Sequence, residues 1–338
     1  MKFLLIKLNH LGDTLLLTPT IRFLRETYPD AVIDVMVRRG CETVLEGNPD
    51  ISRLIAIGRS VNTATPVNRL REGWSRFQYI LTQGYDFAFD LSHSDRAKLW
   101  TLLSRAKYRA INDAYHSVGW KRLLFNRFSY FQWGREHQVL RDFRTVTDAL
   151  KVNATPGPLV LFPRANESSL KERFSFLQSG RPYAIIHPTS RWAYKQWLPE
   201  RWAAVADRLA ERMEVVFTSG PNEREIGHVR AILHLTKKPC FFTEGKTTLH
   251  ELALLIQKAR LFAGVDTVAM HIAAAMQTPI IALFGPSSEW SWRPWQCPHE
   301  LALGECSCKK TRHFICDKNK PYPCMESISV ADVCAKME

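Results

Sequence analysis

Short apolar runs of strand length alternate with segments of helical periodicity over most of the chain. A helical pattern covers residues 14–28 and is followed by Pro29, a residue that stops helices. Strands that alternate with helices form βαβ units, so the first half predicts a parallel sheet covered by helices. The apolar runs that predict its strands lie at residues 3–8, 32–37, 54–57 and 87–91.

The pattern loosens around residues 151–181, where "NATPGPLVLFPRANESS" is rich in proline, glycine, asparagine and serine. The alternation then restarts. We therefore expect an α/β protein of two Rossmann-like parallel-sheet domains, residues 1–155 and 181–338, joined by a linker at 156–180 and facing across a cleft. The second domain's predicted strands lie at 183–187, 215–219, 240–242, 261–264 and 280–284, and its predicted helices at 199–212, 223–235, 249–258 and 268–276.

The composition suits a soluble globular protein of two domains. The chain has 338 residues, of which 46% are apolar and 23% charged. No apolar run approaches the ~20 residues that a membrane-spanning helix needs. The opening "MKFLLIKLNH" has the basic start and apolar stretch of a signal peptide, but Lys7, Asn9, His10 and Asp13 interrupt it and no small-residue cleavage site follows. We expect a first buried strand and a cytoplasmic protein.

The formal charge of +13 favours an anionic partner: nucleic acid, an anionic membrane surface or a polyanionic substrate. Part of the excess is local, because residues 92–141 hold ten Lys or Arg against three Asp or Glu. This stretch could bind RNA, lie on anionic lipid, or form a solvated face over a core. The aromatic residues interleaved with its charges are Trp100, Trp120, Phe125, Phe128, Tyr130, Phe131 and Trp133.

Eight cysteines are present, six of them after residue 296. A metal cluster of Cys306, Cys308, Cys316 and Cys324 would lack the paired CxxC spacing of ordinary zinc sites. We expect buried or free thiols in preference to a metal.

Asp13 follows the first predicted strand, directly after Gly12 and at the beginning of a helix. An aspartate in that place caps a helix or acts as a general base. The helix dipole would favour its ionised form in either role.

The second half presents polar groups after three of its strands. In "HPTSRWAYKQW", Thr189 and Ser190 supply donors and Lys195 a compact cation, which suits a pyrophosphate. In "GVDTVAMHIAAA", Asp266 and Thr267 begin a helix that carries His271, and a helix N-terminus can bind an anion. The third group, in "TSGPNERE", consists of Gly220, Pro221 and Glu223, where the turn brings backbone close to a ligand or simply begins a helix.

Several motifs of nucleotide chemistry are absent. The chain has no GxGxxG, no GxxxxGK[ST], no nucleophile elbow and no Asp-x-Asp triplet. A diphosphate would therefore have to be met by Lys195, hydroxyl groups and helix ends, without a metal.

Together these stretches resemble the ADP-heptose:lipopolysaccharide heptosyltransferases of glycosyltransferase family 9, which have the GT-B architecture. The resemblance covers nearly the whole chain, except residues 92–141 and 297–325, and looks most like the heptosyltransferase III type. It is carried by "HLGDTLLLTPTIRFLRETYPDA", "RPYAIIHPTSRWAYKQW", "VVFTSGP" and "LFAGVDTVAMHIAAAMQTPIIALFGPSSEWSWRPW".

The resemblance implies an inverting, metal-independent transfer from ADP-L-glycero-β-D-manno-heptose to the lipopolysaccharide inner core, as a side branch on heptose II. It implies Asp13 as the base, Thr189, Ser190 and Lys195 as the phosphate loop, and Asp266, Thr267 and His271 as donor-binding, with Glu223 less securely placed. We expect the acceptor, lipid A with Kdo and heptose, and the cytoplasmic face of the inner membrane to meet a basic surface, and the last helix to pack back toward the N-terminal domain. The residues expected in that surface are Arg96, Lys98, Arg105, Lys121, Arg122 and Arg127.

Three alternatives stay open: type I or II acceptor specificity, another nucleotide-sugar transferase or epimerase on the same scaffold, and a nucleic-acid-binding protein. The last predicts steeply salt-dependent binding of RNA or DNA and leaves Asp13 and the other residues after strands without a purpose.

Overall fold

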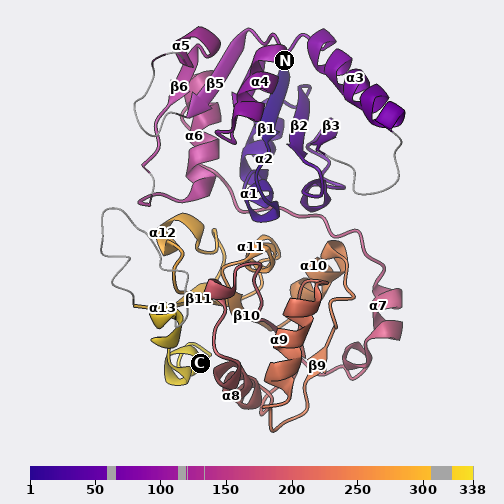
Figure 1. Cartoon of the computed structure of the whole chain (residues 1–338), viewed down its shortest axis with the longest axis vertical. Coiled ribbons are helices and arrows are strands. Elements are labelled where there is room, and N and C mark those ends of the chain that lie inside the picture. Colours follow the sequence, from indigo (N-terminus) through magenta and orange to yellow (C-terminus); the bar gives the residue numbers. More distant parts are fainter. Residues whose placement is uncertain (59–65, 113–118, 120, 133, 306–321, 338) are drawn as a thin grey trace. The chain divides into compact units, whose positions relative to one another are not determined.

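A computed structural model describes residues 1–58, 66–112, 119, 121–132, 134–305 and 322–337, with the side chains of 66–72 and 121 outside that description. The chain divides into two compact units, Met1–Phe162 and Pro163–Glu338 (Figure 1). Each unit is built on its own six-stranded sheet, and every neighbouring pair of strands is parallel.

The sheet of the first unit has the strand order β3-β2-β1-β4-β5-β6. The alternation of the sequence predicts four of these strands, and the structure adds β5 and β6 at one edge. The strands are β1 (Lys2–Lys7), β2 (Val32–Arg38), β3 (Arg53–Ile57), β4 (Phe87–Asp90), β5 (Tyr108–Asn112) and β6 (Arg127–Ser129). The helices are α1 (Leu11–Leu15), α2 (Thr18–Thr27), η1 (Glu42–Val44), α3 (Pro66–Thr82), α4 (Asp95–Leu103), α5 (Lys121–Leu124) and α6 (Gln138–Leu150).

The central strand β1 is buried on both faces, as expected of a parallel sheet between two helical layers. Leu4 and Ile6 join a core cluster that includes Ala97 of α4. Because side chains alternate along a strand, Lys7 lies on the opposite face. There α2 packs on α6, with the rings of Phe23 and Phe143 edge to face at 5.0 Å.

The second unit repeats the topology, with the order β12-β11-β10-β7-β8-β9. Its strands are β7 (Tyr183–His187), β8 (Glu214–Phe217), β9 (Phe241–Phe242), β10 (Leu261–Val265), β11 (Ile280–Phe284) and β12 (His299–Leu303). Its helices are α7 (Glu167–Arg173), η2 (Ser175–Leu177), η3 (Ala193–Lys195), α8 (Pro199–Leu209), α9 (Glu223–Leu233), α10 (Leu249–Lys258), α11 (Val268–Ala275), α12 (Glu289–Trp292), α13 (Pro323–Glu326) and α14 (Val330–Cys334).

The C-terminal helices join the core of the second unit. Val333 of α14 lies in the same buried cluster as Trp202 of α8. The backbone of Cys324 in α13 runs so close to Gly304 that a Cβ there would lie 1.7 Å from the Cys324 carbonyl oxygen. Gly304 is therefore required by packing.

Each sheet has one topological switch point, where the order in which successive strands are added to the sheet reverses. It lies between β1 and β4 in the first unit and between β7 and β10 in the second. The loops after these two strands leave in opposite directions and open a crevice at their carboxyl ends, the usual ligand site of such sheets. Asp13 follows β1, and Lys195 and Asp266 follow β7 and β10. The topology thus brings each to a crevice of its own unit.

Candidate active site

Asp13 is the third residue of α1, and His10 is the N-cap. The backbone N–H of His10 donates to Asp13 Oδ2 at 3.3 Å, which holds one oxygen of the partly exposed carboxylate. Asp13 Oδ1 makes no hydrogen bond within the described residues. Asp13 therefore takes part in capping the helix, as the third residue of a capping box whose N-cap is His10, and its Oδ1 remains available to a substrate hydroxyl.

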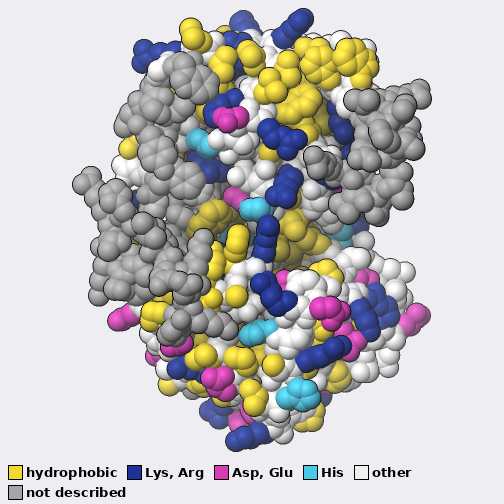
Figure 2. Space-filling model, in the orientation of Figure 1, with side chains coloured by type: hydrophobic (Ala, Val, Ile, Leu, Met, Phe, Trp, Pro, Cys, Tyr) yellow, Lys and Arg dark blue, Asp and Glu magenta, His cyan; other side chains and the backbone are white. Residues whose placement is uncertain are grey.

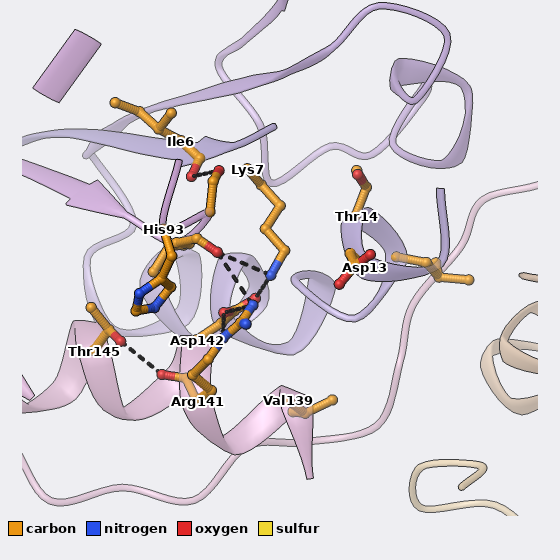
Figure 3. Close-up of polar contacts among 12 residues, drawn as sticks. Ile6, Lys7, Asp13, Thr14, His93, Val139, Arg141, Asp142 and Thr145 are labelled. Carbon is orange, nitrogen blue, oxygen red and sulfur yellow. Dashed lines mark hydrogen bonds and ion pairs between the residues drawn. The ribbon is translucent and has the colours of Figure 1, made fainter. Parts of the chain in front are cut away.

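Beside Asp13 lies an ion triad that joins the end of β1 to α6 (Figure 3). Lys7 Nζ lies 2.5 Å from Asp142 Oδ2 and donates to the Leu91 carbonyl oxygen at 3.2 Å. Arg141 Nη2 lies 2.9 Å from Asp142 Oδ1 and also donates to the Leu91 carbonyl, at 3.3 Å. The side chains of Lys7 and Asp142 are each 1% exposed, so solvent screens the pair little.

Electrostatics links this triad to Asp13. Burial lowers the pKa of Lys7 below its usual value, as does the nearby Arg141 guanidinium. Asp142 and Asp13 act in the opposite direction and raise the pKa of Lys7. Both carboxylates are therefore close enough to stabilise the ammonium.

The loop after β4 forms the other wall of this crevice. Asp90 Oδ1 accepts the backbone N–H groups of Ser92 and His93, both at 3.0 Å. Burial nevertheless raises the pKa of Asp90 to about 6. His93 has a left-handed backbone, with φ of 57°, a conformation that is uncommon outside glycine and turns its side chain at a tight bend.

In the second unit, Lys195 at the end of η3 pairs with Asp266 after β10. Lys195 Nζ lies 2.6 Å from Asp266 Oδ2, and their side chains are 21% and 8% exposed. The ammonium can therefore be reached from solvent while its charge is balanced. An anionic ligand that binds Lys195 has to share it with Asp266.

A buried network lies next to this pair. Glu225 Oε2 accepts the Thr189 hydroxyl at 2.8 Å and the Gly220 N–H at 3.0 Å, and Glu225 Oε1 accepts Asn222 Nδ2 at 2.5 Å. Burial acts to raise the pKa of Glu225, but the hydrogen bonds from Asn222, Thr189 and Gly220 hold it below its usual value. One carboxylate thus fixes the loop after β7 to the turn after β8.

His187 extends the network across the sheet. Its Nδ1 lies 2.8 Å from the Thr218 hydroxyl oxygen, and its Nε2 lies 3.5 Å from the hydroxyl oxygen of Thr189. Burial lowers the pKa of His187 to about 4, so the imidazole is neutral near pH 7.

The other donor-binding residues predicted from the sequence lie on the same rim of the second unit, in different environments. Ser190 is buried, and its hydroxyl accepts the Trp192 N–H at 3.2 Å. Thr267 occupies the N-cap position of α11, and His271 is buried within that helix. Pro221 and Glu223 are exposed, whereas Glu225, two residues further, is the buried acid of this turn.

The sequence reading missed Lys7 as a site residue, together with Asp142 and Glu225. A signal for Lys7 existed, because it is a charged residue at the end of a run that is otherwise buried. A signal for Glu225 was its place three residues after Asn222, the N-cap of α9, although Glu223 is equally acidic. For Asp142 there was none, because its partner Lys7 lies 135 residues away along the chain.

The basic residues predicted for an acceptor or membrane surface differ in their exposure and in their partners. Arg96, Arg105 and Arg122 are exposed. Lys98 pairs with Asp95 at 2.7 Å, and the Arg127 guanidinium lies 4.3 Å from the centre of the Tyr108 ring. The side chain of Lys121, with Trp120 and Trp133, lies outside the described residues.

Among the described residues, no group of three or more His, Cys, Asp or Glu side chains is arranged to hold a metal ion. Cys324 is buried, whereas Cys306, Cys308 and Cys316 fall outside the description. No helix in the described part of the chain has both the length and the apolar character to cross a bilayer.

Two doubly wound parallel-sheet units in one chain form the GT-B architecture. The solved structure of a glycosyl transferase family 9 protein from Veillonella parvula matches 99% of this chain and 95% of its own, with a TM-score of 0.80 at 21% identity. The family model of glycosyltransferase family 9 (heptosyltransferase) matches residues 74–322. The chain belongs to this family.

Two curated relatives cover most of the chain. The lipopolysaccharide heptosyltransferase 3 of Escherichia coli is 32% identical over 333 residues, which span 97% of this chain and 95% of the relative. The lipopolysaccharide heptosyltransferase 2 of Salmonella typhimurium is 26% identical over 304 residues, which span 85% of this chain and 84% of the relative.

Proposed function

We propose that this enzyme transfers a heptose from ADP-L-glycero-β-D-manno-heptose to the lipopolysaccharide inner core, with the acceptor choice of the heptosyltransferase 3 type. The observation that carries the proposal is the 32% identity to a heptosyltransferase 3 over 97% of the chain, against 26% over 85% for a heptosyltransferase 2.

In the first unit, we assign the general base to Asp13. The backbone N–H of His10 fixes Oδ2, which leaves Oδ1 to take the proton of the acceptor hydroxyl as that hydroxyl attacks the anomeric carbon. Attack on the face opposite the departing ADP inverts the anomeric centre. General-base assistance of this kind is typically worth ~10²–10⁴-fold in rate.

In the second unit, we assign the diphosphate to Lys195, Thr189 and Ser190, with the N-terminus of α11 at Thr267. Charge accumulates on the ADP phosphate as the bond to the sugar breaks, and a fixed cation with hydrogen-bond donors stabilises that charge without a metal. Asp266 is negative, so we assign it to hydroxyl groups of the donor and to the orientation of Lys195.

For the acceptor, we assign an anionic surface to the exposed basic and apolar side chains of α4, α5 and β6. Figure 2 shows Lys and Arg side chains among hydrophobic ones over this part of the first unit. An anionic lipid leaflet attracts each nearby cation by ~1 kcal/mol before screening by salt. The exposed apolar side chains are Leu99 at 54%, Leu102 at 42%, Leu123 at 82%, Phe128 at 36% and Tyr130 at 43% exposure.

The test is mass spectrometry of the product formed from ADP-heptose and a set of truncated core acceptors. We expect one heptose to be added to an acceptor that already carries heptose II, and none to an acceptor that ends in Kdo. Addition to the Kdo-terminated acceptor would assign type I specificity. Turnover with UDP-sugars but not with ADP-heptose would overturn the proposal.

The base assignment is tested with Asp13→Asn, which removes the proton acceptor and keeps the shape. We expect turnover to fall by at least ~10²-fold, while the dissociation constant of ADP-heptose stays within about twofold. The matched control is Asp30→Asn, an exposed aspartate in the loop before β2, which should leave both unchanged. Wild-type turnover in Asp13→Asn would remove Asp13 from the mechanism.

A further inference from the structure

A hollow lies at the amino-terminal edge of the sheet in the second unit. Leu209 at the end of α8, Cys334 at the end of α14 and Leu261 at the start of β10 line it. Figure 1 shows α8 beside the C-terminal end of the chain, where this hollow lies. Its volume of about 400 Å³ falls within the ~300–1,000 Å³ that small-molecule sites occupy.

The hollow is separate from the donor crevice of the same unit. Strand β10 begins at Leu261, which lines the hollow, and ends directly before Asp266 of the crevice. At ~3.3 Å per residue, the strand keeps these two residues about 16 Å apart. A small molecule in the hollow therefore does not occupy the groups assigned to the diphosphate.

The lining of the hollow carries four cations and, within the described residues, no carboxylate. The four cations are Arg208, Arg212, Arg260 and Lys336. Arg208 is paired, because its Nη1 lies 2.7 Å from Glu211 Oε2. The other oxygen of this carboxylate lies 3.3 Å from Lys238 Nζ, so Glu211 already serves two cations.

Lys336 has two acids near it. Its Nζ lies 3.5 Å from Glu300 Oε2. Hydrogen bonds from Ser329 and the charge of Lys336 hold the pKa of Asp332 in α14 below its usual value. The charge of Lys336 is therefore offset, as that of Arg208 is.

Arg212 and Arg260 differ from the other two cations. Their side chains are exposed and make no ion pair or hydrogen bond within the part of the chain that the structure describes, whose last residue is Met337. Glu214 begins β8 nearby but points to the opposite face of the sheet, because its neighbour Val215 packs in the core cluster beneath α8. Arg212 and Arg260 are thus the cations that the hollow offers to a ligand.

Helix ends account for part of this charge. Arg208 and Arg212 lie at the carboxyl end of α8, and Arg260 follows the carboxyl end of α10, where a cation offsets the helix dipole. The dipole does not require cations from two helices to line one hollow with an apolar floor. An anionic ligand accounts for both the convergence and the floor.

The apolar part of the lining is aliphatic or contains sulfur. Met213, Leu261 and Met337 line the hollow and pack against the core of the unit. Among the described residues, none that lines the hollow is aromatic. Aromatic rings are the usual partners of a nucleobase, whereas flexible methionines adapt to irregular aliphatic surfaces. The lining therefore favours an acyl chain over a nucleotide.

We propose that this hollow binds an anionic lipid through its phosphate and one acyl chain. The guanidinium groups of Arg212 and Arg260 hold the phosphate, since their N–H groups match phosphate oxygens in geometry and charge. The acyl chain lies on Met213, Leu261 and Met337. This site goes beyond the proposed transfer reaction and does not depend on it.

The experiment titrates dihexanoyl phosphatidic acid, at concentrations where it stays monomeric, into the full chain and follows binding by calorimetry. We expect saturable binding with a dissociation constant below ~1 mM. Arg212→Ala and Arg260→Ala should each weaken it about tenfold, because each removes a charge-assisted contact. The matched control is Arg164→Ala, an exposed arginine elsewhere in the same unit, which should leave the affinity within about twofold.

Two further probes separate the head group from the chain. Dihexanoyl phosphatidylcholine keeps the chains without the net charge, and inorganic phosphate keeps the charge without the chains. Each should bind at least about tenfold more weakly than dihexanoyl phosphatidic acid. Equal binding of phosphatidylcholine would leave an apolar hollow only, and equal binding of inorganic phosphate an anion site only. Either result overturns the proposal.

Methionine methyl signals locate the bound probe. In protein labelled with ¹³C at the methionine methyl groups, the lipid should shift the signals of Met213 and Met337, assigned from Met213→Leu and Met337→Leu. The signal of Met36, buried in β2 of the first unit, should stay in place. The proposal is overturned if the Met213 and Met337 signals do not move, or if excess ADP displaces the lipid.

A transfer assay separates this site from the proposed function. If wild-type protein transfers no heptose but binds the lipid with these shifts, the proposed function fails and the lipid site stands. If it transfers heptose but binds no lipid, the lipid site fails and the proposed function stands.

Discussion

Replacing Glu225 by glutamine tests whether one buried carboxylate holds the donor crevice of the second unit together. In the wild-type protein, Glu225 accepts three donors, from Thr189, Gly220 and Asn222. Glutamine keeps the volume and offers one oxygen and one NH₂ group. If the oxygen serves Thr189 and Gly220, the new NH₂ faces the NH₂ of Asn222.

Asn222 cannot turn its amide round to resolve this conflict. Its Oδ1 already accepts the Glu225 backbone N–H at 3.0 Å as the N-cap of α9. The charge-assisted hydrogen bond from Asn222 is lost and its NH₂ donor is left unpaired, which costs about 1–3 kcal/mol of stability. The hydrogen bonds from Thr189 and Gly220 remain, but their acceptor is now neutral. We expect the free energy of unfolding to fall by about 2–4 kcal/mol in total.

The stability that Glu225 contributes depends on pH, and the direction of this dependence follows from its pKa. The pKa of Glu225 is lowered from the usual 4.5 on folding, so its ionised form stabilises the protein above that value. This stabilisation is lost as the pH falls through the lower pKa of the folded state. The difference between wild type and Glu225→Gln should therefore be largest at neutral pH and shrink below pH 4.5.

The assay is urea unfolding followed by intrinsic fluorescence, to which the buried Trp197 and Trp202 of the second unit contribute. Glu223→Gln, in the exposed first turn of the same helix, is the matched control and should stay within about 0.5 kcal/mol of wild type. The reasoning is refuted if Glu225→Gln is as stable as wild type at pH 7, or if Glu223→Gln loses as much.

Three further predictions follow from the same structure. His187 is buried in its neutral form, with a pKa of about 4 against 6.5 in the unfolded chain, so acidification from pH 6.5 to 4 should remove about 3 kcal/mol of stability. Urea unfolding measures this loss, and the variant His187→Asn should not show it. Gly264→Ala would place a Cβ 2.9 Å from the His187 carbonyl oxygen, so a thermal melt should show a loss of about 1–3 kcal/mol, whereas Gly227→Ala, with open space on α9, should be neutral or stabilising. Arg105→Ala and Arg122→Ala should each weaken binding to anionic vesicles about fivefold in sedimentation at low salt, without changing ADP affinity, and the exposed Arg181 of the second unit supplies the control.

The sequence by itself determined the alternation of strands and helices, and with it the two parallel sheets. Continuous apolar runs of strand length and helical spacing are local signals, so β1 and the helix beginning near Asp13 could be read directly. Strands β5 and β6 and the edge strand β12 were missed, because charged or polar residues interrupt their short apolar runs YRAIN, RFS and HELAL. Polar residues placed after strands likewise pointed to Asp13 and Lys195, since the carboxyl ends of parallel strands share one edge.

Only the tertiary structure decided which charges meet. Lys7 is an ordinary end of a strand until α6 brings Asp142 to it from 135 residues away, and no local pattern encodes that distance. Glu223 and Glu225 look alike in the sequence, but the helix turns one toward solvent and the other onto Thr189. Burial and pairing fix the charge state of each group, and both depend on neighbours that folding alone supplies.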